Sequence, residues 1–303
     1  MFLWLLTFYQ TGPNGLFIFY QVFNLILQSA ERKMNEIKLI AIDIDGTLVN
    51  SKKEITPAVK KAVLAARDEG KQIVICTGRP LSGAQRYLDE LGLNKQDNEY
   101  VVSFNGAVVE STNGQVIFKQ GLKYDDYIDL EAIARKLNLH FHSVSLDRIY
   151  TANRDLGHYT IYNSRVVKLE VSYRTQEEMR HIPIIKCMYI DDPDYLDSKI
   201  TSPLFQKMKD RVVFSKTEPF YYEATAAGVD KGTGLRRLCD YLKIAPQNVM
   251  ALGDQANDAP MLEYAGVGVA MGNAVDYTKE HADAVTADCD HDGVALAINK
   301  FAK

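Results

Sequence analysis

Apolar residues recur along the chain with two different periods, and together these periods predict an α/β fold from residue 34 onward. Short, nearly continuous apolar runs, typical of buried strands, cover 38–45, 71–76 and 100–109. Between these runs, apolar positions recur every three to four residues over 56–70 and 82–93, as in amphipathic helices. Strands that alternate with helices in this way predict a parallel, doubly wound sheet.

The helix predicted over 56–70 has defined ends. Thr56 belongs to the residue types that cap helix N-termini, and Pro57 suits the first helical position. Gly70 ends the helix, and the strand that follows stops at Thr77. Polar groups therefore follow directly on the carboxyl end of a buried strand, where such sheets bind ligands.

The middle of the chain has a different organisation. In chain order the pattern predicts a helix over 125–138, strands over 139–145, 148–153 and 184–191, a helix over 192–210, and strands over 212–216 and 220–225. The strands tend to come in pairs, which is typical of an antiparallel sheet. We therefore expect an α+β insert over 116–216.

After the insert the alternation of strands and helices returns. The pattern predicts helices over 231–242, 258–265 and 291–302 and strands over 248–254 and 266–271. The core domain is therefore expected to be discontinuous, formed by 34–115 and 217–303, with the insert as a lid over its active edge.

Composition is ordinary for a globular protein and excludes several classes. The 303 residues are enough for two domains, and 24% are charged and 47% hydrophobic. A net charge of −4 provides no basic footprint for nucleic acid. The four cysteines lie far apart without a CxxC pair, so we expect reduced thiols in a cytoplasmic protein rather than disulfides or a zinc site.

Residues 1–33 depart from this average. The first thirty contain no Asp, Glu, Lys or Arg, and eight of the chain's thirty aromatic residues. Gly12 and Pro13 interrupt the apolar stretch, which argues against a membrane helix, and the basic start of a signal peptide is missing. Met34 directly precedes the first strand, so we expect 1–33 to be a non-native leader and no membrane association; a real interfacial anchor is the alternative.

Two carboxylates follow the first strand. Asp43 and Asp45 flank Ile44 in the sequence DIDGT, and Gly46 allows a turn that brings both to one ligand. One carboxylate can serve as a nucleophile and the other as a general acid and base. The competing interpretation is an acidic loop that only caps the next segment.

Three further polar segments are weak signals when each is taken alone. The hydroxyl of Thr77 and the N–H of Gly78 can bind phosphate oxygens, or can belong to an ordinary turn. Lys231 stands at a predicted helix N-terminus, which suits an anion, although most lysines are only solvated. The acids and the amide of 253–258 can hold Mg²⁺ through oxygen atoms, or can cap a helix.

In their order along the chain these segments resemble the haloacid dehalogenase-like (HAD) hydrolase superfamily. The likeness is greatest to the Cof-type branch, with its bacterial sugar phosphatases of the YidA type. It covers 34–303 and includes SFNGA (103–107), TANRD (151–155) and YAGVGVAMGNA (264–274). The resemblance implies a HAD-like doubly wound parallel-sheet core with an inserted C2-type cap.

The resemblance also implies roles for individual residues. Asp43 would be the nucleophile that forms an aspartyl-phosphate, and Asp45 would protonate the leaving group and then activate water. Mg²⁺ would be held by the Asp43 carboxylate, the Asp45 carbonyl and Asp254; Asp258 would orient these ligands or pair with Lys231. The groups implied for the phosphate and the rest of the substrate are those of Ile44, Thr77, Gly78, Asn105, Lys231 and Asn257.

The activity implied is Mg²⁺-dependent hydrolysis of small phosphorylated metabolites, above all sugar phosphates. A sugar phosphomutase, which passes phosphate to a hydroxyl group, and a non-catalytic sugar-phosphate sensor are the alternatives.

The first step needs a proton on Asp45, so we expect its surroundings to favour the neutral acid at least transiently. Cys76 lies within a predicted buried strand and is expected to be a core residue, and His142 to be a strand residue without a role at the site.

Overall fold

The computed structural model describes residues 36–94 and 98–302. Residues 1–33, for which the sequence predicts a non-native leader, lie outside the described residues. In the described part of the chain no helix is both long and apolar enough to cross a membrane.

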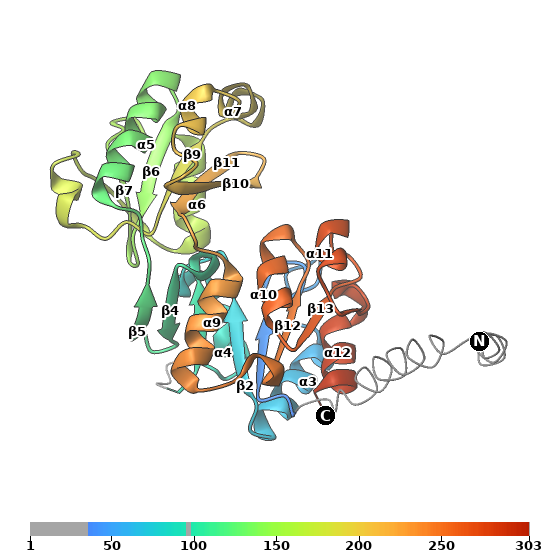
Figure 1. The fold of residues 1–303 in the computed structure, drawn as a ribbon. Helices are drawn as coiled ribbons and strands as arrows, with labels where there is room; N and C mark the ends of the chain where they lie inside the picture. The colour runs from blue at the N-terminus through green and yellow to red at the C-terminus, as the bar shows by residue number, and fades with distance from the viewer. Residues whose placement is uncertain (1–35, 95–97, 303) are drawn as a thin grey trace, which may run out of the picture. The chain divides into compact units, whose positions relative to one another are not determined.

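An eight-stranded sheet organises the core, which we define as 37–119 and 231–302 (Figure 1). Its strand order is β14-β13-β12-β1-β2-β3-β4-β5. The parallel strands are β1 (Leu39–Ile42), β2 (Gln72–Cys76), β3 (Tyr100–Ser103), β12 (Val249–Gly253), β13 (Val267–Ala270) and β14 (Ala284–Val285). Strands β4 (Val108–Ser111) and β5 (Val116–Lys119) are antiparallel additions at one edge.

Strand β1 lies at the centre because its residues are apolar on both faces. All four are buried, and they pair with β12 on one side and β2 on the other. A strand covered on both faces reads as a continuous apolar run, as this one does. The segment that follows β1 is therefore held at the middle of the sheet's carboxyl edge.

Helices of the core pack in pairs around this sheet. Helix α3 (Pro57–Asp68) contacts α12 (Gly293–Phe301), and α9 (Lys231–Leu242) contacts α10 (Ala259–Tyr264). The remaining helical segments are α4 (Leu81–Glu90), α11 (Asp276–Glu280), and the 3₁₀ turns Phe104–Gly106, Pro246–Asn248, Ala256–Asp258 and Cys289–His291. At the start of α3 the Thr56 hydroxyl accepts the Val59 N–H at 3.2 Å, so the predicted cap is present.

The insert, 124–226, has a six-stranded sheet of its own with the order β10-β11-β9-β6-β7-β8. Its strands are β6 (His140–Val144), β7 (Arg148–Thr151), β8 (Glu170–Tyr173), β9 (Lys186–Ile190), β10 (Val212–Glu218) and β11 (Tyr221–Ala226). Its helices are α5 (Tyr124–Leu137), α6 (His158–Val167), α7 (Pro193–Ile200), α8 (Pro203–Gln206) and a 3₁₀ turn at Glu178–His181. Neighbouring strands are antiparallel except β7 and β8, which are parallel.

The insert's limits differ from the expected 116–216 at both ends. Strand β5 pairs with β4, so it belongs to the eight-stranded sheet. Strands β10 and β11 form one hairpin, and β11 pairs with β9, so the insert extends past 216. Each difference arises because a hairpin keeps two consecutive strands in the same sheet.

Two predicted elements are broken in the structure. The strand expected over 100–109 is interrupted because φ is positive at Phe104, Asn105 and Gly106, and β4 returns antiparallel to β3. The helix expected over 192–210 ends at Ile200, and α8 starts at Pro203, whose ring nitrogen cannot continue the hydrogen-bond ladder.

Candidate active site

Segments that are far apart in the sequence meet at the carboxyl edge of the core sheet. Asp43 follows β1, Thr77 follows β2 and Asp254 follows β12, while Lys231 is the first residue of α9. Parallel strands present their carboxyl ends at one edge, which explains why short polar sequences converge there.

Lys231 is the centre of this arrangement. Its Nζ lies 2.6 Å from Oδ1 of Asp43 and 2.5 Å from Oδ1 of Asp258, and its side chain is only 2% exposed. Burial lowers the pKa of Lys231, but the two carboxylates outweigh burial and raise it. The ammonium group is therefore charged, and it orients both aspartates.

Asp43, Asp254 and Asp258 form a compact acidic cluster. Each offers a carboxylate oxygen, and these oxygens lie within 4.8 Å of one another. When all three carboxylates are ionised, one ammonium group leaves two negative charges unbalanced, which a single divalent cation would neutralise. Oxygen donors of this kind suit a hard cation such as Mg²⁺.

Asp258 differs from the other two carboxylates because its oxygens are already engaged. Oδ1 faces Lys231, and Oδ2 accepts the backbone N–H groups of Asp254 and Gln255, both at 2.9 Å. The geometry therefore suits Asp258 for holding the loop after β12 in place. Asp43 and Asp254 are left as the carboxylates best placed to hold a cation.

Both of these remaining carboxylates bind protons more tightly than ordinary aspartates. Burial and the negative charge of Asp258 raise the pKa of Asp43 to about 8 against the opposing effect of Lys231. Burial also raises the pKa of Asp254 to about 6. This is the consequence of like charges gathered in a buried place.

The position of Asp254 depends on contacts from three segments. Its carboxylate accepts hydrogen bonds from Thr47 Oγ1 at 3.3 Å, Gln255 Nε2 at 2.9 Å and Asn273 Nδ2 at 3.4 Å. Asn273 Nδ2 also lies 2.9 Å from the carbonyl oxygen of Gly46. Sequence reasoning missed the Asn273 contact, although Asn273 falls within the YAGVGVAMGNA segment.

Gly46 is required where the chain turns past Asp254. Its φ is +79°, and a Cβ at this position would lie 2.4 Å from Oδ2 of Asp254. The glycine of DIDGT therefore serves both the turn and the close approach of the two loops.

Asp45 is held by two cations. Arg79 makes a two-point contact, with Nε 2.9 Å from Oδ2 and Nη2 2.8 Å from Oδ1, and Lys53 Nζ lies 2.9 Å from Oδ1. Burial raises the pKa of Asp45, but Arg79 and Lys53 outweigh it, so the pKa is lowered. This arrangement favours the ionised form, so the neutral acid that the first step needs would have to arise transiently. The contacts of the two cations with Asp45 could not be predicted from the sequence.

The loop after β3 brings Asn105 to the site. The N–H of Asn105 donates to the carbonyl of Thr77 at 2.9 Å, and its side-chain oxygen accepts from Asn257 Nδ2 at 3.0 Å. Asn105 also lies against Gly78, where a Cβ would come within 3.0 Å of its side chain. The phosphate-binding candidates Thr77, Gly78, Asn105 and Asn257 are thus neighbours, while Ile44 lies between the two aspartates with its side chain buried.

Other titratable residues do not join the site. Cys76 is fully buried in the core, as predicted, and burial raises the pKa of its thiol. His142 is buried within the insert, where Asn163 Nδ2 lies 3.1 Å from Nε2, and burial lowers its pKa to about 3. Glu223 is engaged with Lys186 Nζ, 2.9 Å from each carboxylate oxygen.

Comparison with known proteins assigns the family. A model of haloacid dehalogenase-like hydrolases matches residues 40–298. The chain belongs to this family. A candidate phosphatase of Streptococcus pyogenes is 41% identical over 88% of this chain and 98% of its own length. The 5-amino-6-(5-phospho-D-ribitylamino)uracil phosphatase YcsE of Bacillus subtilis is 30% identical over 90% of this chain and 99% of its own.

A solved structure extends the likeness to the fold. The HAD subclass IIB sugar phosphatase BT4131 superimposes with a TM-score of 0.72 at 25% identity, over 87% of this chain and 98% of its own. The HAD relationship expected from the motifs is confirmed, and this HAD-family chain is a phosphatase.

Proposed function

We propose that this phosphatase hydrolyses sugar phosphates in a Mg²⁺-dependent reaction, through an aspartyl-phosphate formed on Asp43. The observation that carries the proposal is the Asp43 carboxylate, buried at the end of the central strand and 2.6 Å from Lys231 Nζ. A nucleophile in this position has a fixed direction of attack, and a neighbouring cation offsets the repulsion between carboxylate and phosphate.

The reaction has two displacements. An Asp43 oxygen bonds to phosphorus while the bond to the sugar oxygen breaks, and Asp45 gives its proton to that oxygen. A water molecule then attacks phosphorus, Asp45 takes a proton from the water, and the bond to Asp43 breaks to release inorganic phosphate. Asp45 ends each cycle protonated again, so the protons balance.

Mg²⁺ would be held by the carboxylates of Asp43 and Asp254 and by the backbone carbonyl of Asp45. When bound it supplies positive charge that neutralises the phosphoryl oxygens and balances the cluster. The two unbalanced negative charges of the described cluster, and the contacts that fix Asp254, support this assignment.

The phosphoryl group would be bound by neighbouring hydrogen-bond donors. The Thr77 hydroxyl, the N–H groups of Ile44 and Gly78, and Lys231 Nζ serve this role, with Asn257 beside them. Asn105, fixed by Asn257 and by the backbone of Thr77, would contact the rest of the substrate. Donors that are already in place cost little reorganisation when charge develops in the transition state.

Asp45 must exchange its partners during catalysis. In the structure Arg79 and Lys53 keep it ionised, which is the form needed to activate water. A bound phosphate dianion would compete for these cations and raise the pKa of Asp45 toward the form that donates a proton.

The substrate class is supported by the relatives. BT4131 is described as a sugar phosphatase, and YcsE acts on a phosphate carried by a ribityl chain. A phosphate ester on a polyhydroxylated carbon chain is common to both. We expect cytoplasmic metabolites of this kind to be the substrates here.

A phosphate-release assay tests the proposal. The full chain is supplied with Mg²⁺ and a panel of hexose phosphates, pentose phosphates, ribitol 5-phosphate and nucleoside monophosphates. We expect phosphate release from the sugar and polyol esters, loss of release in EDTA, and recovery when Mg²⁺ is added back. Release only from nucleotides would reject the substrate class, and activity in exhaustive chelation would reject the metal.

Analysis of the remaining sugar distinguishes the phosphatase from a phosphomutase. Hydrolysis yields free sugar and inorganic phosphate in equal amounts. An isomerised sugar phosphate without free phosphate would instead assign a phosphotransferase that uses the same Asp43 chemistry.

A further inference from the structure

Asn273 has no part in the chemistry proposed above, yet it contacts both loops that would hold the cation. Its Nδ2 lies 2.9 Å from the carbonyl oxygen of Gly46, in the loop after β1. The same nitrogen lies 3.4 Å from Oδ2 of Asp254, in the loop after β12. A primary amide nitrogen carries two hydrogens, so one hydrogen is available for each acceptor. A single side chain therefore joins the two loops.

A third contact fixes the direction in which the Asn273 amide points. Its Oδ1 accepts the N–H of Cys289 at 2.9 Å. The reversed amide would place its oxygen against two acceptors, on Gly46 and Asp254, and its nitrogen against a donor. Only one orientation of the amide therefore satisfies all three partners, and in it the NH₂ group is directed at the site.

The backbone around Asn273 is held as well. The N–H of Val275 donates to the carbonyl of Asp254, and the N–H of Gly272 donates to the carbonyl of Ala287, both at 3.0 Å. These bonds attach the segment to the loop after β12 on one side and to the residues after β14 on the other. Although Asn273 is exposed, its side chain therefore extends toward the loop after β1 from a fixed support.

The other side-chain contacts of Asp254 show what is particular to Asn273. Gln255 Nε2, 2.9 Å from Oδ2, belongs to the same loop as Asp254, and Thr47 Oγ1, 3.3 Å from Oδ1, comes from the loop after β1. Asn273 comes from a third segment and contacts both loops at once. Without it, Thr47 would be the one side chain of the loop after β1 that contacts Asp254 in the part of the chain that the structure describes.

We propose that Asn273 is a positioning residue for the cation site, which sets the distance between the Gly46 turn and the Asp254 carboxylate. This inference rests on the proposed function, because the cation is the one assigned there to Asp43, Asp254 and the Asp45 carbonyl. Removing a group that orients metal ligands typically costs about 10- to 100-fold in metal affinity. The effect of Asn273 should therefore fall on the affinity for the cation.

Calorimetric titration of the full chain with Mg²⁺, without any substrate, tests the proposal. We expect Asn273→Ala to weaken the Mg²⁺ affinity by about tenfold or more, because the two loops lose their common partner. Asn273→Ser, whose side chain is too short to reach both acceptors, should weaken the affinity to a similar extent. Circular dichroism in EDTA confirms that each variant is folded.

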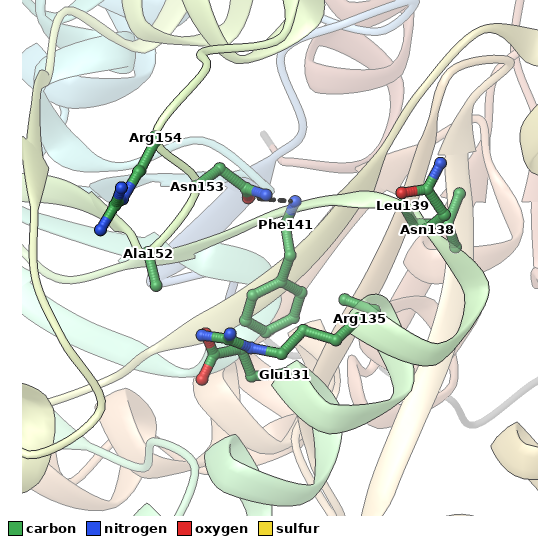
Figure 2. A pocket seen from close by; sticks show the side chains of 9 residues that line it. Glu131, Arg135, Asn138, Leu139, Phe141, Ala152, Asn153 and Arg154 are labelled. Carbon is green, nitrogen blue, oxygen red and sulfur yellow. Dashed lines mark hydrogen bonds and ion pairs between the residues drawn. The ribbon is translucent and has the colours of Figure 1, made fainter.

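Asn153→Ala is the matched control. Asn153 lines a cavity of the insert, where its side-chain oxygen accepts the N–H of Phe141 at 3.1 Å (Figure 2). The same oxygen accepts the hydroxyl of Thr151, also at 3.1 Å. Removing this amide costs hydrogen bonds as well, but these bonds are made within the insert. We expect Asn153→Ala to bind Mg²⁺ as tightly as the wild-type chain.

The dependence of turnover on Mg²⁺ separates a positioning role from a general loss of structure. In Asn273→Ala, the Mg²⁺ concentration that gives half-maximal phosphate release should rise by about the same factor as the Kd for Mg²⁺. At saturating Mg²⁺, kcat and KM should stay near the wild-type values. A variant that is only damaged would instead lose kcat at every Mg²⁺ concentration, which would contradict the proposal.

Two calorimetric results would overturn the proposal and leave the proposed function in place. One is an equal Mg²⁺ affinity of the wild-type chain and both Asn273 variants, and the other is an equal loss of affinity in Asn153→Ala. A wild-type chain that binds no Mg²⁺ would reject the proposed cation together with the role of Asn273.

Discussion

At the scale of single residues, the site depends on how one ammonium group is shared. Lys231 is buried between Asp43 and Asp258 and contacts both at hydrogen-bond distance. A fixed cation between two acids holds both carboxylates in place, and neither can move without leaving charge unpaired in a buried place. The orientation of Asp43 is therefore determined by the protein before any substrate arrives.

The nucleophile assignment predicts the effect of Asp43→Asn. The amide is nearly the same size, so the fold should be retained, but it cannot form the phosphorylated intermediate. We expect phosphate release to fall by at least about a thousandfold. The measurement is phosphate release together with circular dichroism, and Asp240→Asn on the exposed side of α9 is the matched control.

An active Asp43→Asn enzyme would reject the assignment. Trapping of radiolabelled phosphate on the wild-type chain during turnover, and its absence in Asp43→Asn, would identify the same carboxylate by an independent route.

The contacts of Asp45 predict a change in pH dependence. Replacing Arg79 by Met removes the cation that most opposes the effect of burial, so the pKa of Asp45 should rise. The protonated acid then persists to higher pH, and the falling limb of kcat/KM should move upward by about one pH unit or more. Arg237→Met, on the surface of α9, should leave the profile in place. A profile that is unchanged in Arg79→Met would show that Asp45 is not the group that donates the proton.

At the scale of elements, the loop after β3 and the start of α9 are built against each other. Phe104 and Asn105 have φ values of +52° and +56°, which non-glycine residues rarely adopt. Two backbone hydrogen bonds, from Phe104 to the carbonyl of Arg79 and from Asn105 to that of Thr77, hold this conformation. Strain retained at a loop that carries a site residue is consistent with a positional role for the loop.

Gly106 is the point of closest approach and allows a prediction. Its φ is +94°, and a Cβ would lie 1.9 Å from the carbonyl oxygen of Asp230, the residue that caps α9 before Lys231. Gly106→Ala should therefore displace the start of α9, lower activity, and destabilise the protein. Gly114→Ala is the matched control, because its φ is +88° with open space around it.

Both alanine variants carry the cost of a positive φ, and only Gly106→Ala adds a clash. We expect the free energy of unfolding, measured in urea, to fall by roughly 1–3 kcal/mol more in Gly106→Ala than in Gly114→Ala. Equal losses in the two variants, with full activity in both, would mean that the contact with Asp230 has no influence on the site.

The same elements show what the sequence could predict. Strand β1 and helix α3 could be predicted because their signals are local: a continuous apolar run, and a cap followed by a 3.6-residue period. The reversal at Phe104 could not, because Phe and Asn have no local preference that forces positive φ at both positions. The β4–β5 hairpin did carry a signal, the Asn113-Gly114 turn, but the pattern predicts no strand directly after it, and 116–119 is therefore expected in the insert.

For the site, the sequence could predict that the polar segments meet at one edge of the sheet, but not which side chains contact one another there. Asp43, Thr77 and Asp254 follow parallel strands, so topology alone brings them to one edge. The cations around Asp45 and the amide of Asn273 reach the site from neighbouring loops, whose paths depend on packing. Sequence spacing carries no information about such contacts.

At the scale of the whole molecule, the acidic cluster links metal binding to stability. In the metal-free protein the pKa of Asp43 is raised to about 8, so the native state retains a proton there that the unfolded chain releases near pH 4. Stability therefore falls as the pH rises between these values. His142 acts in the opposite direction, because its pKa is lowered to about 3, but its effect ends above about pH 6.5.

Between pH 6.5 and 8 the effect of Asp43 is joined by that of the exposed His291, because Asp288 raises the pKa of His291, and only the Asp43→Asn variant separates the two. In EDTA, Asp43 should make the free energy of unfolding measured in urea fall with a slope of about 1.4 kcal/mol per pH unit near pH 6.5, which declines to about half that value near pH 8 as Asp43 ionises in the native state. Saturating Mg²⁺ should remove the decline, because a cation that binds the ionised carboxylate stabilises only the native state. Asp43→Asn should remove it as well, without any metal. A slope that is the same in EDTA, in Mg²⁺ and in Asp43→Asn would show that the cluster neither holds the proton nor binds the cation.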